Sequence, residues 1–237
     1  MVDFSKTVMR LLLSGVLAGI LFVCAGVSAL DGSIGSMTVS AAEKGMTEMT
    51  ENDGDFDPET ETAGETDTDT DAGGGESADG TLCIVIDPGH GGENLGGEYE
   101  DYTEKEMTIV VARAMKEELE QYEGVTVYLT RDGDQELSLD ERCEFAERVG
   151  ADFLFCLHFN MSEHHTLFGA ECWVSAFGEN YSKGYGFASV EMELLQELGL
   201  YSRGIKTRLN DRGTDYYGII RHATERDIPC VLIEHCH

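Results

Sequence analysis

Basic residues are scarce in this 237-residue chain, in which 16 lysines and arginines stand against 46 aspartates and glutamates. The formal net charge is therefore −30 at pH 7. A chain with this excess of negative charge is repelled by the phosphate backbone of nucleic acids. We therefore expect no nucleic-acid partner.

Large apolar side chains are scarce between residues 43 and 79, where fourteen acidic residues accompany the single Lys44. Such a stretch cannot bury enough apolar surface to offset the entropy lost on ordering. Its like charges also repel one another and extend the chain. The composition therefore predicts a disordered acidic linker over residues 30–80.

The N-terminus carries Lys6 and Arg10, followed by an apolar run over residues 11–27 and by the small-residue sequence Val27-Ser28-Ala29. This order is typical of a secretory signal peptide, which we predict over residues 1–29. The protein is then exported to the cell wall or the extracellular space. The alternative is an uncleaved membrane anchor, because residues 11–30 are long enough to span a bilayer.

Seven cysteines are present, and six remain once the predicted signal peptide is removed. Export leaves disulfide bonds possible. However, Cys83, Cys156 and Cys230 each lie in an apolar, strand-like run, where a cysteine behaves as a small buried hydrophobic residue. We therefore expect mostly thiols rather than disulfides.

Strand-like and helix-like patterns alternate in the rest of the chain. Helices are predicted at 103–122, 138–150 and 186–199, and strands at 82–87, 125–131, 151–160, 170–177 and 229–234. Three of the strand patterns are nearly continuous apolar runs, which is typical of parallel strands buried on both faces. The sequence therefore predicts one α/β domain over residues 81–237, with a mostly parallel twisted sheet flanked by helices on both faces.

Chemically active side chains follow three of the predicted strands. His90 comes just after the first strand, and His158 and Glu234 lie at the ends of two later ones. Ligands of such sheets bind in the crevice beyond the carboxyl ends of the strands. Histidines together with carboxylates suit zinc, whose catalytic sites combine three protein ligands with one open position.

The third ligand should be a carboxylate close to His90. Thr103 and Glu106 have the spacing of a capping box, which would give Glu106 a structural role at the start of a helix. Glu104 then remains available as a ligand. The residues alone leave a second interpretation open, in which Glu104 only interacts with the helix dipole.

Four separated segments carry a resemblance to a known family. They are "IVIDPGHGG" (84–92), "EKE" (104–106), "YLTRDGDQELSLDERCEFAERVGADFLFCLHFN" (128–160) and "RGIK…YYGIIRHATERDIPCVLIE" (203–234). In order and spacing they resemble the zinc-dependent N-acetylmuramoyl-L-alanine amidases of the amidase_3 family. The resemblance covers about residues 82–237 and implies hydrolysis of the amide between N-acetylmuramic acid and L-alanine in peptidoglycan.

The resemblance also implies roles for individual residues. His90, Glu104 and His158 stand at the positions of the family's zinc ligands, and Glu234 stands at that of its catalytic glutamate. In this reaction zinc activates a water molecule, and Glu234 serves as general base and then as general acid. The glycines that flank His90 are expected to let the backbone turn sharply toward the metal.

Three further residues are predicted to lie around the metal ligands or the substrate. We expect Asp87 to support the loop or a ligand, and Asn160 and Arg221 to lie near the ligands or the substrate. Trp173, the only tryptophan, is expected in the core rather than as a stacking platform for a sugar.

The sequence departs from the family pattern at its C-terminal end. The family continues after the catalytic glutamate into a final helix, whereas this sequence stops at His235-Cys236-His237. We therefore expect a domain truncated at the C-terminus and lacking its last helix. The alternative to a monomeric enzyme is a noncatalytic cell-wall-binding or regulatory module with the same fold.

Overall fold

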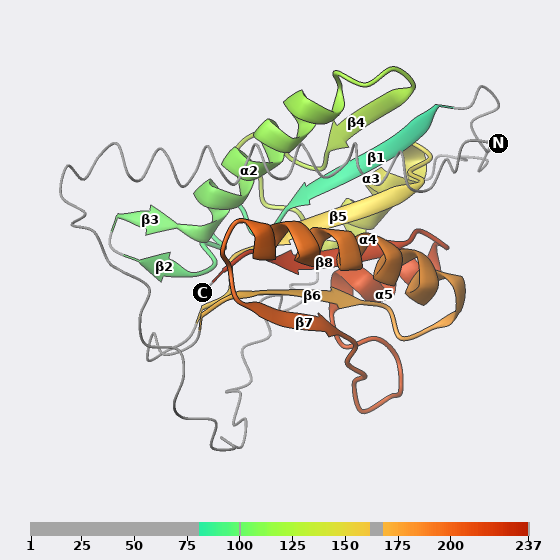
Figure 1. The fold of residues 1–237 in the computed structure, drawn as a ribbon. Helices are drawn as coiled ribbons and strands as arrows, with labels where there is room; N and C mark the ends of the chain where they lie inside the picture. Colours follow the sequence, from blue (N-terminus) through green and yellow to red (C-terminus); the bar gives the residue numbers. More distant parts are fainter. Residues whose placement is uncertain (1–80, 100, 162–167, 237) are drawn as a thin grey trace, which may run out of the picture.

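The computed structural model describes residues 81–99, 101–161 and 168–236 (Figure 1). Within these ranges a six-stranded sheet has the strand order β4-β1-β5-β8-β6-β7. In chain order its strands are β1 (Leu82–Pro88), β4 (Val125–Leu129), β5 (Phe153–His158), β6 (Ala170–Val174), β7 (Ser202–Lys206) and β8 (Cys230–Glu234). A separate two-stranded hairpin is formed by β2 (Glu98–Tyr99) and β3 (Tyr102–Thr103).

Most neighbouring strands of the large sheet are parallel. β4, β1, β5 and β8 pair in parallel with one another, and so do β6 and β7. Only the pairing of β6 with β8 is antiparallel. The prediction of a mostly parallel sheet is therefore confirmed, and the carboxyl ends of β1, β5 and β8 meet at one edge.

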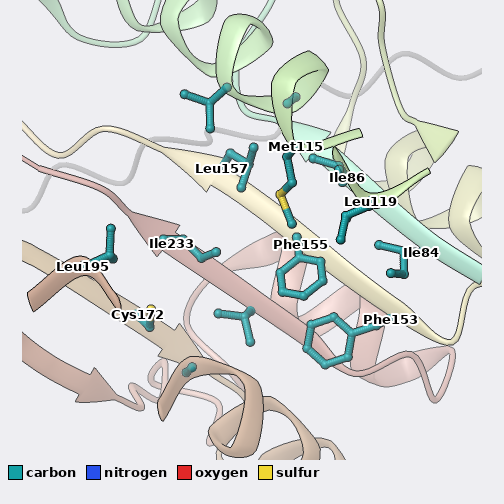
Figure 2. Close-up of a cluster of buried hydrophobic side chains, with 14 of the residues drawn as sticks. Ile84, Ile86, Met115, Leu119, Phe153, Phe155, Leu157, Cys172, Leu195 and Ile233 are labelled. Carbon is teal, nitrogen blue, oxygen red and sulfur yellow. The ribbon is translucent and has the colours of Figure 1, made fainter. Parts of the chain in front are cut away.

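Helices cover both faces of the sheet. α2 (Glu104–Leu119) and α4 (Gly178–Glu197) pack on one face, in the cluster that includes Ile84 and Ile86 (Figure 2). α3 (Leu139–Arg148) and α5 (Gly218–Glu225) pack on the other face, against Val85. Alternate residues of β1 thus enter opposite cores, which explains why the strand is apolar without interruption.

The structure differs from the sequence prediction in several elements. α4 begins at Gly178 rather than at residue 186, and β6 ends at Val174 rather than at residue 177. The first turns of α4 contain three glycines, which lower helix propensity, but packing of the helix on the sheet outweighs that preference. β7, α5 and the hairpin were not predicted.

The predicted capping box at the start of α2 is wrong. Thr103 is the N-cap residue, but its side chain accepts no hydrogen bond from the helix backbone. Its hydroxyl instead donates to Oε2 of Glu106 at 2.8 Å. A complete capping box occurs on α3, between Ser138 and Glu141.

Five of the six cysteines in the described ranges are buried, and none of the six forms a disulfide, in agreement with the sequence analysis. The predicted signal peptide and acidic linker lie outside the described residues. Among the helices that the structure describes, none has the length and apolar character needed to cross a membrane.

Candidate metal centre

The backbone after β1 makes a sharp turn at His90. His90 has φ 63°, and the next two residues, Gly91 and Gly92, have φ 133° and 58°. Glycine adopts such angles readily, whereas a residue with a side chain is strained by about 1–3 kcal/mol. His90 therefore keeps this conformation only because its surroundings hold the loop.

Two buried arginines hold this loop. Arg142 donates from Nη2 to the carbonyl oxygen of His90 at 2.8 Å, and from Nη1 to Asp87 Oδ1 at 2.8 Å. Arg131 donates from Nη2 to the carbonyl oxygen of Gly89 at 2.8 Å. The sequence pattern alone did not predict a role for either arginine. The only indication was that both lie in the segment 128–160, the third of the four segments that carry the family resemblance.

Asp87 lies beneath the loop as the acidic partner of Arg142. The carboxylate is fully buried, which by itself raises its pKa, but the charge of Arg142 and the hydrogen bonds from Thr130, Arg142 and Cys156 together lower the pKa below its ordinary value. Asp87 is therefore ionised and pairs with the residue that fixes His90. The expected role of Asp87 in supporting the loop or a ligand stays a prediction.

Replacing Arg142 with methionine is expected to lower the free energy of unfolding by about 3–5 kcal/mol, because Asp87 would remain buried without its cation. Urea denaturation measures this loss. Arg148→Met is the matched control, since Arg148 is an exposed arginine of the same helix and should change stability by less than about 0.5 kcal/mol. Equal effects of the two substitutions would contradict the assignment.

The three predicted ligands meet at the edge of the sheet. His90 follows β1, Glu104 opens α2 and His158 ends β5, and all three are buried. Glu104 Oε1 lies 3.1 Å from His90 Nε2 and 2.9 Å from His158 Nδ1. One potential ligand atom from each residue lies within 4.8 Å of the others.

The chemistry of these atoms fits a zinc ion. His90 Nδ1 lies 2.9 Å from Oδ1 of Asn94, an acceptor that places the proton on Nδ1. His90 Nε2 then carries a lone pair, and this buried atom forms no hydrogen bond within the described part of the chain. Sequence reasoning missed Asn94, which sets this tautomer.

Glu104 contributes the carboxylate of this cluster. Its burial alone would raise its pKa, but hydrogen bonding to His158 and the proximity of His90 lower the pKa well below the ordinary value. Its oxygens also accept hydrogen bonds from the backbone N–H groups of Phe159 and Gly97. Two imidazoles and an ionised carboxylate are a ligand set of catalytic zinc sites.

Glu234 lies next to this cluster in the sheet. It is the last residue of β8 and the register partner of His158 on β5, and it is only 6% exposed. Its register partner on the other side is Glu171 on β6. Register partners point to the same face of a sheet, so these three side chains share one face at one edge.

The two remaining predicted residues lie farther along the same region. Asn160 donates from Nδ2 to Oε1 of Glu171 at 3.3 Å. Arg221, on α5, donates to the carbonyl oxygens of Asp215 and Tyr216. Trp173 is partly buried and packs against Tyr217, as the expectation of a core role implied.

Residues 84–237 match the family model described as N-acetylmuramoyl-L-alanine amidase, amidase_3. The sporulation-specific N-acetylmuramoyl-L-alanine amidase of Bacillus subtilis (strain 168) is 35% identical over 127 residues, which cover 52% of this chain and 48% of that protein. The chain thus spans about half the length of this relative.

Several solved structures share the fold, among them Cwp6 and the catalytic domain of CwlV. Cwp6 from Clostridium difficile is 29% identical with a TM-score of 0.57, over 66% of this chain and 24% of that chain. The catalytic domain of CwlV, an N-acetylmuramoyl-L-alanine amidase from Bacillus (Paenibacillus) polymyxa var. colistinus, is 26% identical with a TM-score of 0.53, over 66% of this chain and 80% of that chain. Because the family model covers well over half of the sequence, this chain belongs to the amidase_3 family of N-acetylmuramoyl-L-alanine amidases.

Proposed function

We propose that this chain is a zinc-dependent N-acetylmuramoyl-L-alanine amidase, which hydrolyses the amide between N-acetylmuramic acid and L-alanine in peptidoglycan. The observation that carries the proposal is the buried cluster of His90, Glu104 and His158 at the sheet edge that also holds Glu234. The names of the relatives support the same activity.

His90, Glu104 and His158 would hold the metal, which leaves one position of a tetrahedral site open. Zinc bound there would supply a Lewis acid that makes water nucleophilic at neutral pH and polarises an amide carbonyl. Glu234 would accept the proton of the attacking water on a carboxylate oxygen and return it to the departing amine of L-alanine. The amide bond is thereby cleaved without a covalent enzyme intermediate.

The place of action follows from the substrate. Peptidoglycan lies outside the cytoplasmic membrane, so the enzyme must be exported to reach it. The predicted signal peptide over residues 1–29 would provide the export, and the acidic linker over residues 30–80 would extend the reach of the domain. The test of the function is the release of new alanine amino termini from purified peptidoglycan.

Gly89 leaves room for the imidazole of His158 next to the backbone. A β-carbon at this position would lie 2.3 Å from Cε1 of His158, which is far inside van der Waals contact. Gly89→Ala is therefore expected to displace the imidazole and to weaken zinc binding by about 10–100-fold, the usual cost of disturbing the support of a ligand. Competition with a fluorescent chelator measures the zinc affinity.

Gly186→Ala is the matched control for this substitution. Gly186 lies within α4, and a β-carbon there meets no atom within 4 Å. The control variant should bind zinc as tightly as the wild type. A Gly89→Ala protein with undiminished zinc affinity would show that His158 is not a ligand or that its position is not critical.

A further inference from the structure

Glu171 is a buried carboxylate that the proposed mechanism does not use. It is 4% exposed and lies on β6 as the register partner of Glu234. Its Oε2 accepts hydrogen bonds from Arg203 Nε at 2.7 Å and Lys206 Nζ at 2.9 Å. Its Oε1 accepts one from Trp173 Nε1 at 3.0 Å.

A β-bulge brings the two cations to this carboxylate. The register between β6 and β7 shifts so that Ala170 pairs with Ser202 and Glu171 pairs with Gly204, which leaves Arg203 as the additional residue. Gly204 has φ 92°, an angle that favours glycine. Bulges redirect side chains and are frequent next to active sites. Here the bulge lets Arg203 reach the same oxygen as Lys206.

Arg203 and Lys206 together carry more positive charge than the single carboxylate of Glu171 neutralises. Two positive side chains share one carboxylate, in a chain whose net charge is −30. Burial alone would raise the pKa of Glu171, but the hydrogen bonds from Arg203 and Lys206 lower it, so the carboxylate is ionised. Glu171 itself cancels only one of the two positive charges, and its register partner Glu234 is a carboxylate at the same edge of the sheet.

The side chains of Arg203 and Lys206 can each bind a further partner. The side chains of Arg203 and Lys206 are 17% and 27% exposed. Among the described residues, Arg203 uses only Nε in a hydrogen bond, so its terminal nitrogens remain available. Lys206 Nζ also lies 5.3 Å from the centre of the Trp173 ring, which limits its movement. Pre-positioned guanidinium and ammonium groups are well suited to bind a carboxylate.

We propose that Arg203 and Lys206, held in place by Glu171, bind a carboxylate of the stem peptide that follows L-alanine in the substrate. This inference rests on the proposed function, because the register places Glu171 beside Glu234, where the amide would be cleaved. Arg203 and Lys206 then determine specificity, and Glu171 is a positioning residue. The substrate class is an acidic stem peptide rather than one whose carboxylates are amidated.

Steady-state kinetics on two soluble substrates tests this assignment. One is N-acetylmuramoyl-L-alanyl-D-glutamate, and the other is the same compound with its carboxylates converted to carboxamides. The wild type is expected to have a KM about tenfold lower for the acid, the usual size of one charge-assisted contact. Arg203→Gln and Lys206→Met should raise the KM for the acid by about tenfold, leaving kcat and the KM for the amide within about twofold.

Lys183→Met is the control, because Lys183 is an exposed lysine on α4 and should leave both KM values unchanged. Glu171→Gln should weaken the preference for the acid, since it removes the group that positions both cations. Equal losses on both substrates, or a wild type without any preference, would overturn the subsite. Arg203→Gln and Lys206→Met decide the question even if Glu171→Gln does not fold.

A binding measurement separates this inference from the proposed function. Trp173, the only tryptophan, touches both Glu171 and Lys206, so its fluorescence reports occupation of the subsite. Titration with L-alanyl-D-glutamate should change this fluorescence at a concentration about tenfold lower than titration with its diamide. If the protein shows this preference but hydrolyses nothing, the subsite stands and the proposed function fails. Hydrolysis without any preference in either assay rejects the subsite alone.

Discussion

Glu234→Gln is expected to lower the turnover of soluble muropeptides by about 10²–10⁴-fold, the usual contribution of a positioned general base. The amide keeps the size of the side chain but cannot accept the proton of the attacking water. Zinc content should stay at the wild-type level, because His90, Glu104 and His158 provide the three ligands. Initial rates and elemental analysis of the same preparation measure the two quantities.

Glu225→Gln is the matched control, since Glu225 is an exposed glutamate at the end of α5. It should leave both rate and zinc content unchanged. If Glu234→Gln loses its zinc together with its activity, Glu234 is a ligand and the division of roles is wrong. If its rate equals that of the wild type, another residue moves the proton.

His90→Ala and His158→Ala are each expected to reduce the zinc content from about one ion per chain to a small fraction of it, because two remaining ligands do not hold a catalytic zinc tightly. Hydrolysis should be lost in proportion to the metal. Elemental analysis after dialysis measures the content. His222→Ala, which changes a histidine on α5 beside Asp140, should keep its zinc. Undiminished zinc in both ligand variants would reject the metal centre.

The position of the site at the carboxyl ends of the strands could be predicted because the apolar patterns of these strands are strong. Continuous apolar runs marked β1, β5 and β8 as buried parallel strands, and parallel strands bring their carboxyl ends together. His90, His158 and Glu234 were therefore placed at one edge from the sequence pattern. Glu104 was different, because an acidic residue in the first turn of a helix also serves the helix dipole, and only the family resemblance favoured a ligand.

The partners of Asp87 and the other supports of the site could not be predicted because they depend on contacts between distant residues. Arg142 and Asp87 are 55 positions apart, and no local pattern marks an arginine on an amphipathic helix as the buried partner of a carboxylate. Glu171 and Arg203 meet only through the bulge between β6 and β7. Every residue of β7 is partly buried, so neither face of the strand requires apolar side chains. Its sequence therefore shows neither the alternation nor the continuous apolar run that predicts a strand.

The most direct test of the central claim is the release of alanine amino termini from purified peptidoglycan by the zinc-loaded chain. New termini should appear with the wild type, and at least about 100-fold more slowly with Glu234→Gln. Labelling of the amino groups followed by identification of the N-terminal residue measures the product. If the zinc-loaded wild type binds peptidoglycan but releases no alanine termini, the chain is a noncatalytic wall-binding module and the proposed function is wrong.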